Sequence, residues 1–260
     1  MDEDPVLLQV KAGVATITLN RPDRHNAVGE MTEGLLYRYL DLARADREVR
    51  AVVLRANGPS FSSGRDAAEA AEHHPGTPDF DRVEHQQWCA RLLHELPVPT
   101  ICALRGWVLG LGFEWALLCD IRIAADSAKL ALTGIDHGTV GEAAGVARLF
   151  EIGGSALALD LALTGRRLSA LEALRYGLVS RVVADDDLDD VVDDTAHAIA
   201  DRPPLVVRLV REHVRALAAA GVDGTLRREL VSQTLVRSSR GPAEPRAANG
   251  NDREPRVEHS

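Results

Sequence analysis

No apolar run in this sequence is long enough to cross a membrane as a helix. The stretches VPTICAL and WALLCDIRIAA are too short for that and are interrupted. The first ten residues, MDEDPVLLQV, are acidic and lack the basic and then apolar order of a secretory signal. We therefore expect a cytoplasmic protein with no membrane partner.

Cysteine is scarce, and the three cysteines lie far apart among apolar residues, at Cys89, Cys102 and Cys119. Their spacing does not fit a metal site, so we expect reduced thiols in the core and no bound metal. Lysine is scarcer still, since Lys11 and Lys129 are the only two among 30 basic residues. The 39 acidic residues leave a net charge of -9, which argues against a general nucleic-acid-binding protein.

The length of 260 residues and the hydrophobic content of 45% suit one large domain, or one domain with an appendage. The segments VLLQV and GVATITLN predict a hairpin, residues 31–45 an amphipathic helix, and VRAVVLRA a buried strand. Strand, helix and strand in this order open an α/β fold with parallel pairing. Further strands are predicted at TICALRG, DIRIAA, KLAL and LVSRVV, and helices at 82–95, EAAGVARLF, SALALDLALTG, SALEALRYG, 188–199, 204–219 and 223–236.

Two segments look irregular. Residues 72–81 are polar and rich in proline and histidine, which predicts a mobile surface loop. Residues 238–260 contain almost no large apolar side chain, which predicts disorder. Between them, Ser169 and Glu172 have the spacing of a capping box at a helix start.

Two glycine-containing loops, SSGRD and LGLGFE, each lie near a predicted strand end, and the second leads into a helix. Backbone N–H groups at such turns point outward, and two of them that converge can bind an oxyanion. Two ordinary glycine turns are the commoner explanation of the spacing alone. The run VLGLGFEWALLCD also carries Glu114 among apolar residues, and a buried carboxylate is costly unless it is paired, protonated or used in chemistry.

The order of several motifs narrows these alternatives. NRPDRHNAV, VRAVVLRANGPSFSSGRD, PVPTICALRGWVLGLGFEWALLCDIRIAADSAKLAL and LALTGRRLSALEALRYGLVSRVV follow one another. This pattern resembles the enoyl-CoA hydratase/isomerase (crotonase) superfamily from about Val6 to Val214. The resemblance implies an α/β fold, a β-spiral of ββα units over residues 1–200, and a C-terminal helical trimerisation region over 201–237. It also implies a homotrimer or hexamer and an acyl-CoA substrate, with no cofactor besides the CoA of the substrate.

The resemblance further implies where the substrate binds. The thioester oxygen would accept hydrogen bonds from the main-chain N–H groups of Arg65 and Leu111. Relatives usually have glycine where Leu111 stands, so the leucine side chain is expected to reshape the pocket. The other positions that match substrate or CoA contacts are Arg24, Ala27, Ser63, Gly64, Asp66, Gly110, Gly112 and Arg211.

The same resemblance assigns one catalytic acid and leaves the identity of a second one undecided. Glu114 matches the first glutamate of the hydratases, whereas Gly134 occupies the place of the second. Glu142 lies eight residues later, at a position where some members carry a catalytic acid. It is either the partner of Glu114 or a solvated glutamate in the first turn of the next helix. Asp136 and His137 lie in the same loop, where His137 is either an acid–base group or an exposed histidine.

Three functions follow from this pattern. The first is hydratase or dehydratase chemistry on an acyl-CoA through a stabilised enolate. The second is enoyl-CoA isomerisation, or thioester or C–C hydrolysis, because the second acid is altered. The third is a non-catalytic acyl-CoA-binding protein.

Overall fold

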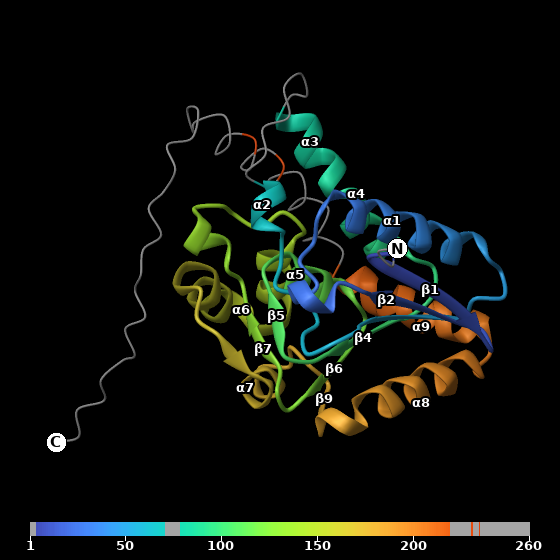
Figure 1. Ribbon diagram of the computed structural model, residues 1–260. Coiled ribbons are helices and arrows are strands. Elements are labelled where there is room, and N and C mark those ends of the chain that lie inside the picture. The colour runs from blue at the N-terminus through green and yellow to red at the C-terminus, as the bar shows by residue number, and fades with distance from the viewer. Residues whose placement is uncertain (1–3, 71–78, 219–229, 231–233, 235–260) are drawn as a thin grey trace.

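A six-stranded sheet forms the centre of the computed structural model, which describes residues 4–70, 79–218, 230 and 234 (Figure 1). In spatial order its strands are β1 (Val6–Lys11), β2 (Val14–Leu19), β3 (Ala51–Ala56), β4 (Thr100–Leu104), β6 (Ile121–Ala125) and β9 (Arg181–Val183). Strands β1 and β2 form the predicted antiparallel hairpin, and every other neighbouring pair is parallel. The α/β prediction is therefore confirmed.

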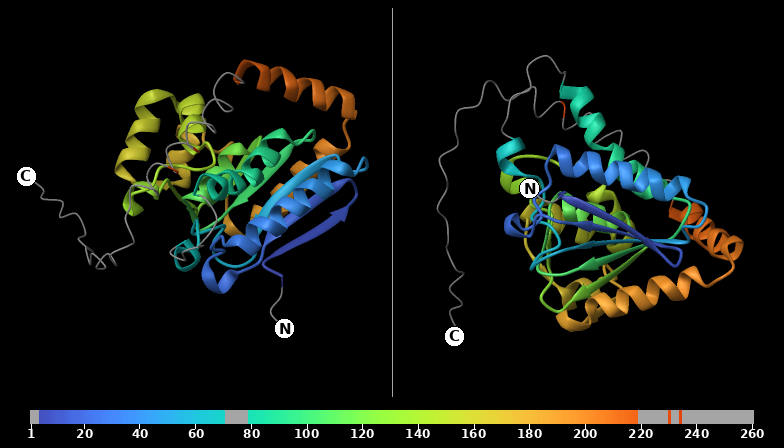
Figure 2. Two further views of the ribbon diagram at one scale, coloured as in Figure 1. Left: turned by 90° about the horizontal axis from the view of Figure 1, so that it is seen from above. Right: turned by 45° about the vertical axis from the view of Figure 1, so that its right-hand side comes forward.

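The central parallel strands β3, β4 and β6 are largely buried on both faces, and their side chains alternate between two apolar cores. Val52 and Leu54 of β3 pack against α1 (Glu30–Ala45), α4 (Trp88–Glu95) and α5 (Leu111–Leu118). Val53, between them, packs with Ile101 against α8 (Leu188–Ala200). The right-hand view of Figure 2 shows the sheet between α1 above and α8 below. Strands buried in this way read as continuous apolar runs, which is how they were recognised in the sequence.

A smaller sheet lies beside the first and carries the second glycine turn. Its strands are β5 (Trp107–Leu109), β7 (Lys129–Ala131) and β8 (Leu168–Ser169), with β5 parallel and β8 antiparallel to β7. The sequence analysis did not predict β5, because three residues before a glycine carry no periodic signal. Strand β5 places the turn at Gly110 directly before α5.

The C-terminal half is largely helical, as predicted. Helix α6 (Gly145–Thr164) is kinked at Gly154, whose φ of 77° and ψ of 177° are not helical, so the two successive helices were correctly separated. Helix α7 (Ala170–Arg175) begins with the predicted capping box of Ser169 and Glu172. Helix α9 (Pro204–Ala218) follows α8. The remaining elements are α2 (Ala67–Ala70), α3 (Asp79–Gln86), η1 (Pro22–Arg24), η2 (Gly134–His137) and η3 (Asp185–Asp187).

Some predicted boundaries were wrong. The helix predicted over 82–95 is divided into α3 and α4 at Gln87, and α3 already begins at Asp79, inside the predicted loop. The strand predicted for LVSRVV begins only at Arg181. Residues 72–78 of the predicted loop, most of the predicted helix over 223–236, and the tail 238–260 lie outside the described residues. Within the described part of the chain, no helix combines the length and apolar character needed to span a bilayer.

Candidate active site

The two glycine turns predicted to supply oxyanion donors lie side by side. The N–H of Ser62 donates to the carbonyl of Trp107, and the N–H of Leu109 donates back to the carbonyl of Ser62, each at 2.9 Å. A Cβ atom built on Gly64 would lie 3.0 Å from the carbonyl oxygen of Leu109. Gly64 has a φ of 90° and Gly110 a φ of 49°, values that side chains disfavour. Both glycines are therefore needed to bring these two backbones together.

The residue after each turn carries an available backbone donor. Leu111 is the first residue of α5, so its N–H has no partner in the helix itself. Within the described part of the chain, no protein group accepts from the main-chain N–H of Arg65 or of Leu111. The side chain of Leu111 packs in the apolar core and is 3% exposed. The two neighbouring turns thus offer two donors to a ligand oxygen.

Glu114 follows in the first turn of α5 and is 4% exposed. Its Oε2 accepts hydrogen bonds from the main-chain N–H groups of Glu142 at 3.1 Å, Ala143 at 2.6 Å and Gly145 at 3.3 Å. The backbone can present these donors together because Ala144 adopts a left-handed conformation with a φ of 63°. A concave row of N–H groups that precedes a helix favours negative charge. The carboxylate of Glu114, which stood out among apolar residues in the sequence, is therefore bound by backbone donors.

Glu114 titrates near neutral pH. Burial, followed by the charge of Glu142, raises the pKa of Glu114 to about 7, although the three N–H donors act to lower it. A group with a pKa close to the working pH is suited to both donate and accept a proton. Glu114 therefore has the environment of a general acid–base residue.

Glu142 is buried, with 8% exposure, so the solvated reading of this residue was wrong. It was also placed incorrectly in a helix, since α6 begins three residues later, at Gly145. Its Oε1 accepts from Nε of Arg65 at 2.8 Å, while its own N–H donates to Glu114. The structure thus brings Glu114, Glu142 and Arg65 into one cluster.

Glu33 of α1 completes this cluster, and the sequence analysis missed it. Its two carboxylate oxygens accept from Nη1 and Nη2 of Arg65, each at 3.1 Å. Burial raises the pKa of Glu33, and the pairing with Arg65 opposes that rise without cancelling it. A signal did exist, because Glu33 lies at helical spacing from the buried Leu36, Leu40 and Ala43, so it had to face inward.

The loops predicted to contact CoA also lie together. The N–H of Val28 donates to the carbonyl of Gly64, and the N–H of Asp66 donates back to Val28, each at 2.8 Å. Asp66 accepts from the N–H of Ala68 at 3.2 Å, so it helps to order its own loop. Arg24 lies 3.8 Å from Asp66 and is 60% exposed. The other predicted members of this segment are Ala27, which accepts from the Arg21 guanidinium at 2.8 Å, and Ser63, whose N–H donates to His25 at 2.8 Å.

Two of the remaining glycines belong to the second turn. The N–H of Gly110 donates to the carbonyl of Ala131 at 2.9 Å, which ties the turn to β7. A Cβ atom on Gly112 would lie 2.6 Å from Cβ of Ser62. Gly112 therefore lets the first turn of α5 pack against the loop that carries Gly64.

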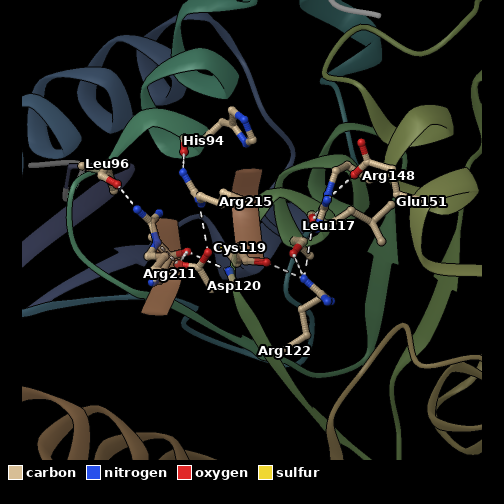
Figure 3. A network of polar contacts seen from close by, with 12 residues as sticks. His94, Leu96, Leu117, Cys119, Asp120, Arg122, Arg148, Glu151, Arg211 and Arg215 are labelled. Carbon is tan, nitrogen blue, oxygen red and sulfur yellow. Dashed lines mark hydrogen bonds and ion pairs between the residues drawn. The ribbon is translucent and has the colours of Figure 1, made fainter. Parts of the chain in front are cut away.

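Arg211 does not join this cluster. It lies on α9, where its Nε donates to Oδ2 of Asp120 at 2.7 Å and its Nη1 to the carbonyl of Leu96 (Figure 3). It lines a cleft of about 460 Å³ between α9 and the core, whose lining residues include neither Glu114 nor Glu142. Arg211 links α9 to the core here, and its role as a CoA contact stays a prediction.

Asp136 and His137 are both exposed on η2, so the exposed reading of His137 fits the structure. The three cysteines are buried and unpaired, as predicted. Across residues 4–70 and 79–218, no group of three His, Cys, Asp or Glu side chains is arranged to hold a metal ion.

Comparison with known proteins agrees with this geometry. The sequence profile of the enoyl-CoA hydratase/isomerase family matches residues 9–235. The 1,2-epoxyphenylacetyl-CoA isomerase of Escherichia coli (strain K12) is 32% identical over 234 residues, which cover 89% of either chain. The carnitinyl-CoA dehydratase of Salmonella paratyphi A is 33% identical over 211 residues, 81% of this chain and 80% of the dehydratase. A crystal structure of an enoyl-CoA hydratase/isomerase from Xanthobacter autotrophicus Py2 superimposes with a TM-score of 0.84 at 32% identity, covering 93% of this chain and 89% of that one.

Proposed function

This chain belongs to the enoyl-CoA hydratase/isomerase family, and we propose that it is an enzyme that transfers protons at the acyl group of a CoA thioester. One observation carries the proposal. Glu114 is buried with a pKa of about 7, and it lies beside the second buried carboxylate, Glu142, close to two available backbone donors.

The two donors would stabilise the charge that develops on the thioester oxygen. Removal of a proton next to a thioester carbonyl gives an enolate, and preorganised N–H groups bind that oxyanion without reorganising at the moment of reaction. The N–H groups of Arg65 and Leu111 are suited to this role because no acceptor among the described residues occupies them. Their function does not depend on the side chains, so the arginine and the leucine are both compatible with it.

The two carboxyl groups would divide the proton transfers. Glu142 is paired with Arg65 and lies beside Glu114, so it serves as the base. The raised pKa of Glu114 keeps a large share of this group protonated near neutral pH, so it serves as the acid. Two buried carboxyl groups in different environments, one paired with a cation and one bound by backbone N–H groups, form an acid–base pair. In hydration or dehydration, this pair would also orient the water molecule that is added or removed.

Double-bond isomerisation is the second candidate, and the position of the second acid favours it. Gly134 occupies the place where the hydratases carry a glutamate, and Glu142 approaches Glu114 from the segment before α6 instead. Isomerisation needs a proton moved between two carbons and no bound water. The related epoxyphenylacetyl-CoA enzyme is named an isomerase.

The proposed proton transfer can be tested directly by isotope exchange. The protein is incubated in D2O with a panel of saturated, 2-enoyl and 3-enoyl CoA thioesters, and the products are measured by mass spectrometry. We expect deuterium on the carbon next to the thioester. Hydration adds the mass of water, isomerisation retains the substrate mass apart from exchange, and hydrolysis releases free CoA. Binding of these thioesters without exchange or turnover would instead identify an acyl-CoA-binding protein.

Gly145→Ala should separate the two carboxyl groups. An added Cβ would lie 2.6 Å from Cγ of Glu114 and 3.2 Å from Cδ2 of Leu132, so the carboxylate must move. A displacement on the order of 1 Å lowers turnover about 10²-fold. Steady-state kcat measures the effect. The matched control is Gly34→Ala on α1, where nothing lies within 4 Å of the added atom, and this variant should keep the wild-type kcat.

Self-association as a trimer or hexamer is part of the same proposal. Large apolar side chains are exposed on three helices of the C-terminal half, and extended apolar surface of this kind is typical of subunit interfaces. They are Phe150, Leu159 and Leu163 on α6, Leu171 and Leu174 on α7, and Leu205, Val206, Leu209, Val210 and Val214 on α9.

A further inference from the structure

Arg65 occupies two positions in the candidate site at once. Its main-chain N–H belongs to the first donor turn, and its side chain reaches the acid–base pair. All three guanidinium nitrogens are engaged, Nε with Glu142 and the two Nη atoms with Glu33. The side chain is 16% exposed, and those of Glu33 and Glu142 are 11% and 10% exposed. Such a cluster holds the orientation of each member closely, because the planar fork of arginine fixes the geometry of the carboxylates that it binds.

Glu142 depends on this arrangement. A buried carboxylate without a cation takes up a proton or turns toward solvent, and either change removes a base. Glu33 anchors the far side of the guanidinium from α1, so that Nε points to Glu142. Burial lowers the pKa of Arg65, but the charges of Glu142 and Glu33 raise it by more, so the net shift is upward and Arg65 keeps its positive charge.

We propose that Arg65 and Glu33 are positioning residues: Glu33 anchors the guanidinium of Arg65, and Arg65 holds the carboxylate of Glu142 beside Glu114 and thereby couples the oxyanion turn to the acid–base pair. This inference rests on the proposed function, because it assigns a role within the same site. Since both carboxylates already occupy the guanidinium fork, the side chain of Arg65 does not bind the substrate. A substrate carboxylate would have to displace Glu33 or Glu142 to reach it.

The charges around Glu142 set the expected direction of each effect. Arg65 faces it from the loop after β3, Glu114 from α5, and Glu33 lies across the guanidinium on α1. His85 of α3 also acts electrostatically on Glu33 and lowers its pKa slightly. Arg65 is shared between two carboxylates, so loss of the Glu33 carboxylate frees the two Nη atoms and lets the guanidinium turn away from its place beside Glu142.

The test compares Arg65→Met, Arg65→Lys and Glu33→Gln with the wild type in one assay. For Arg65→Met we expect kcat to fall about 10²-fold, because the base is displaced. The Kd for a non-reactive acyl-CoA should stay within about 3-fold, since the main-chain donor remains. Arg65→Lys keeps the charge without the fork and should recover about 10-fold of the lost kcat. Glu33→Gln should lower kcat about 10-fold with the same unchanged Kd, because its amide oxygen can accept from only one side of the guanidinium and no longer anchors both Nη atoms.

Arg55→Met is the matched control. Arg55 is also an arginine with 18% side-chain exposure that pairs with two carboxylates, Asp189 and Asp193, but it lies on β3 against α8. The Arg55→Met variant should be less stable than the wild type but should keep the wild-type kcat. A wild-type kcat in Arg65→Met would overturn the positioning role, as would a wild-type kcat in Glu33→Gln if Arg65→Met fails to fold. Either result would leave the proposed function intact as long as Glu142→Gln is inactive. Full activity in both Glu114→Gln and Glu142→Gln would refute the proposed function itself.

Discussion

Replacement of Glu114 by glutamine is expected to lower kcat about 10²- to 10⁴-fold, the range that general acid–base catalysis contributes. Glutamine has nearly the same shape, and its amide oxygen can still accept from the N–H groups of Glu142, Ala143 and Gly145. What the variant loses is the proton that Glu114 exchanges near pH 7. Turnover of the enoyl-CoA panel measures the effect, and undiminished turnover would remove Glu114 from the mechanism.

Stability provides the control for this substitution. The pKa of Glu114 is raised in the folded protein from 4.5 to about 7, so its ionisation opposes folding. The wild type should therefore lose stability relative to Glu114→Gln as the pH rises from about 4.5 to about 7, by a few kcal/mol at most, with no further change above that range. Urea unfolding at several pH values measures the difference. A variant that is inactive and less stable at pH 8 would point to structural damage instead.

Asp120→Ala is expected to lower the free energy of unfolding by about 3 kcal/mol. Asp120 accepts from Nε of Arg211 at 2.7 Å and from Nη2 of Arg215 at 3.2 Å (Figure 3). It also accepts from the N–H of Thr100 at 2.9 Å. Its removal leaves two arginines of α9 without this carboxylate and a buried backbone donor without an acceptor. The expected cost lies at the lower end for a broken buried ion pair, because the carboxylate is 23% exposed.

The pH dependence and a matched variant test this explanation. Burial alone would raise the pKa of Asp120, but Arg211 and Arg215 hold it below its usual value. The stabilisation is therefore fully present above pH about 4 and lost as the pH falls through the lowered pKa, so the difference between the two proteins should shrink in acid. Asp41→Ala breaks an exposed pair with Arg44 and should change stability by less than about 1 kcal/mol. Equal losses in the two variants would contradict the role of Asp120.

The elements that the sequence predicted share one property, which is that each has a strong local signal. The buried runs of β3 and β4 and the amphipathic face of α1 were recognised at nearly their observed bounds. The capping box at Ser169 was recognised for the same reason. Strand β5 was missed because its pairing with β7 joins residues more than 20 positions apart and leaves no local pattern.

The residues of the candidate site also differ in how strong their local sequence signal is. Glu114 was conspicuous because a carboxylate in an apolar run needs an explanation, and the two glycine turns were conspicuous because glycine permits close approach of backbones. The structure shows both turns in contact, as the motif order implied. The role of the Arg65 side chain was not predicted. The chain contains 28 arginines, and arginine side chains in proteins are mostly solvent-exposed, so nothing in the sequence singled out this one.

By itself, the sequence determined the family pattern, the α/β architecture and the presence of one acid without its usual partner at Gly134. Only the tertiary structure decided whether Glu142 is solvated or lies buried beside Glu114. Glu142 could equally have been a solvated glutamate, because nothing local distinguishes the two states. Its burial results from three segments far apart in the chain, α1 with Glu33, the turn with Arg65 and α5 with Glu114, which meet around it. The ionisation of a buried carboxylate depends on such neighbours, and those neighbours are set by the fold.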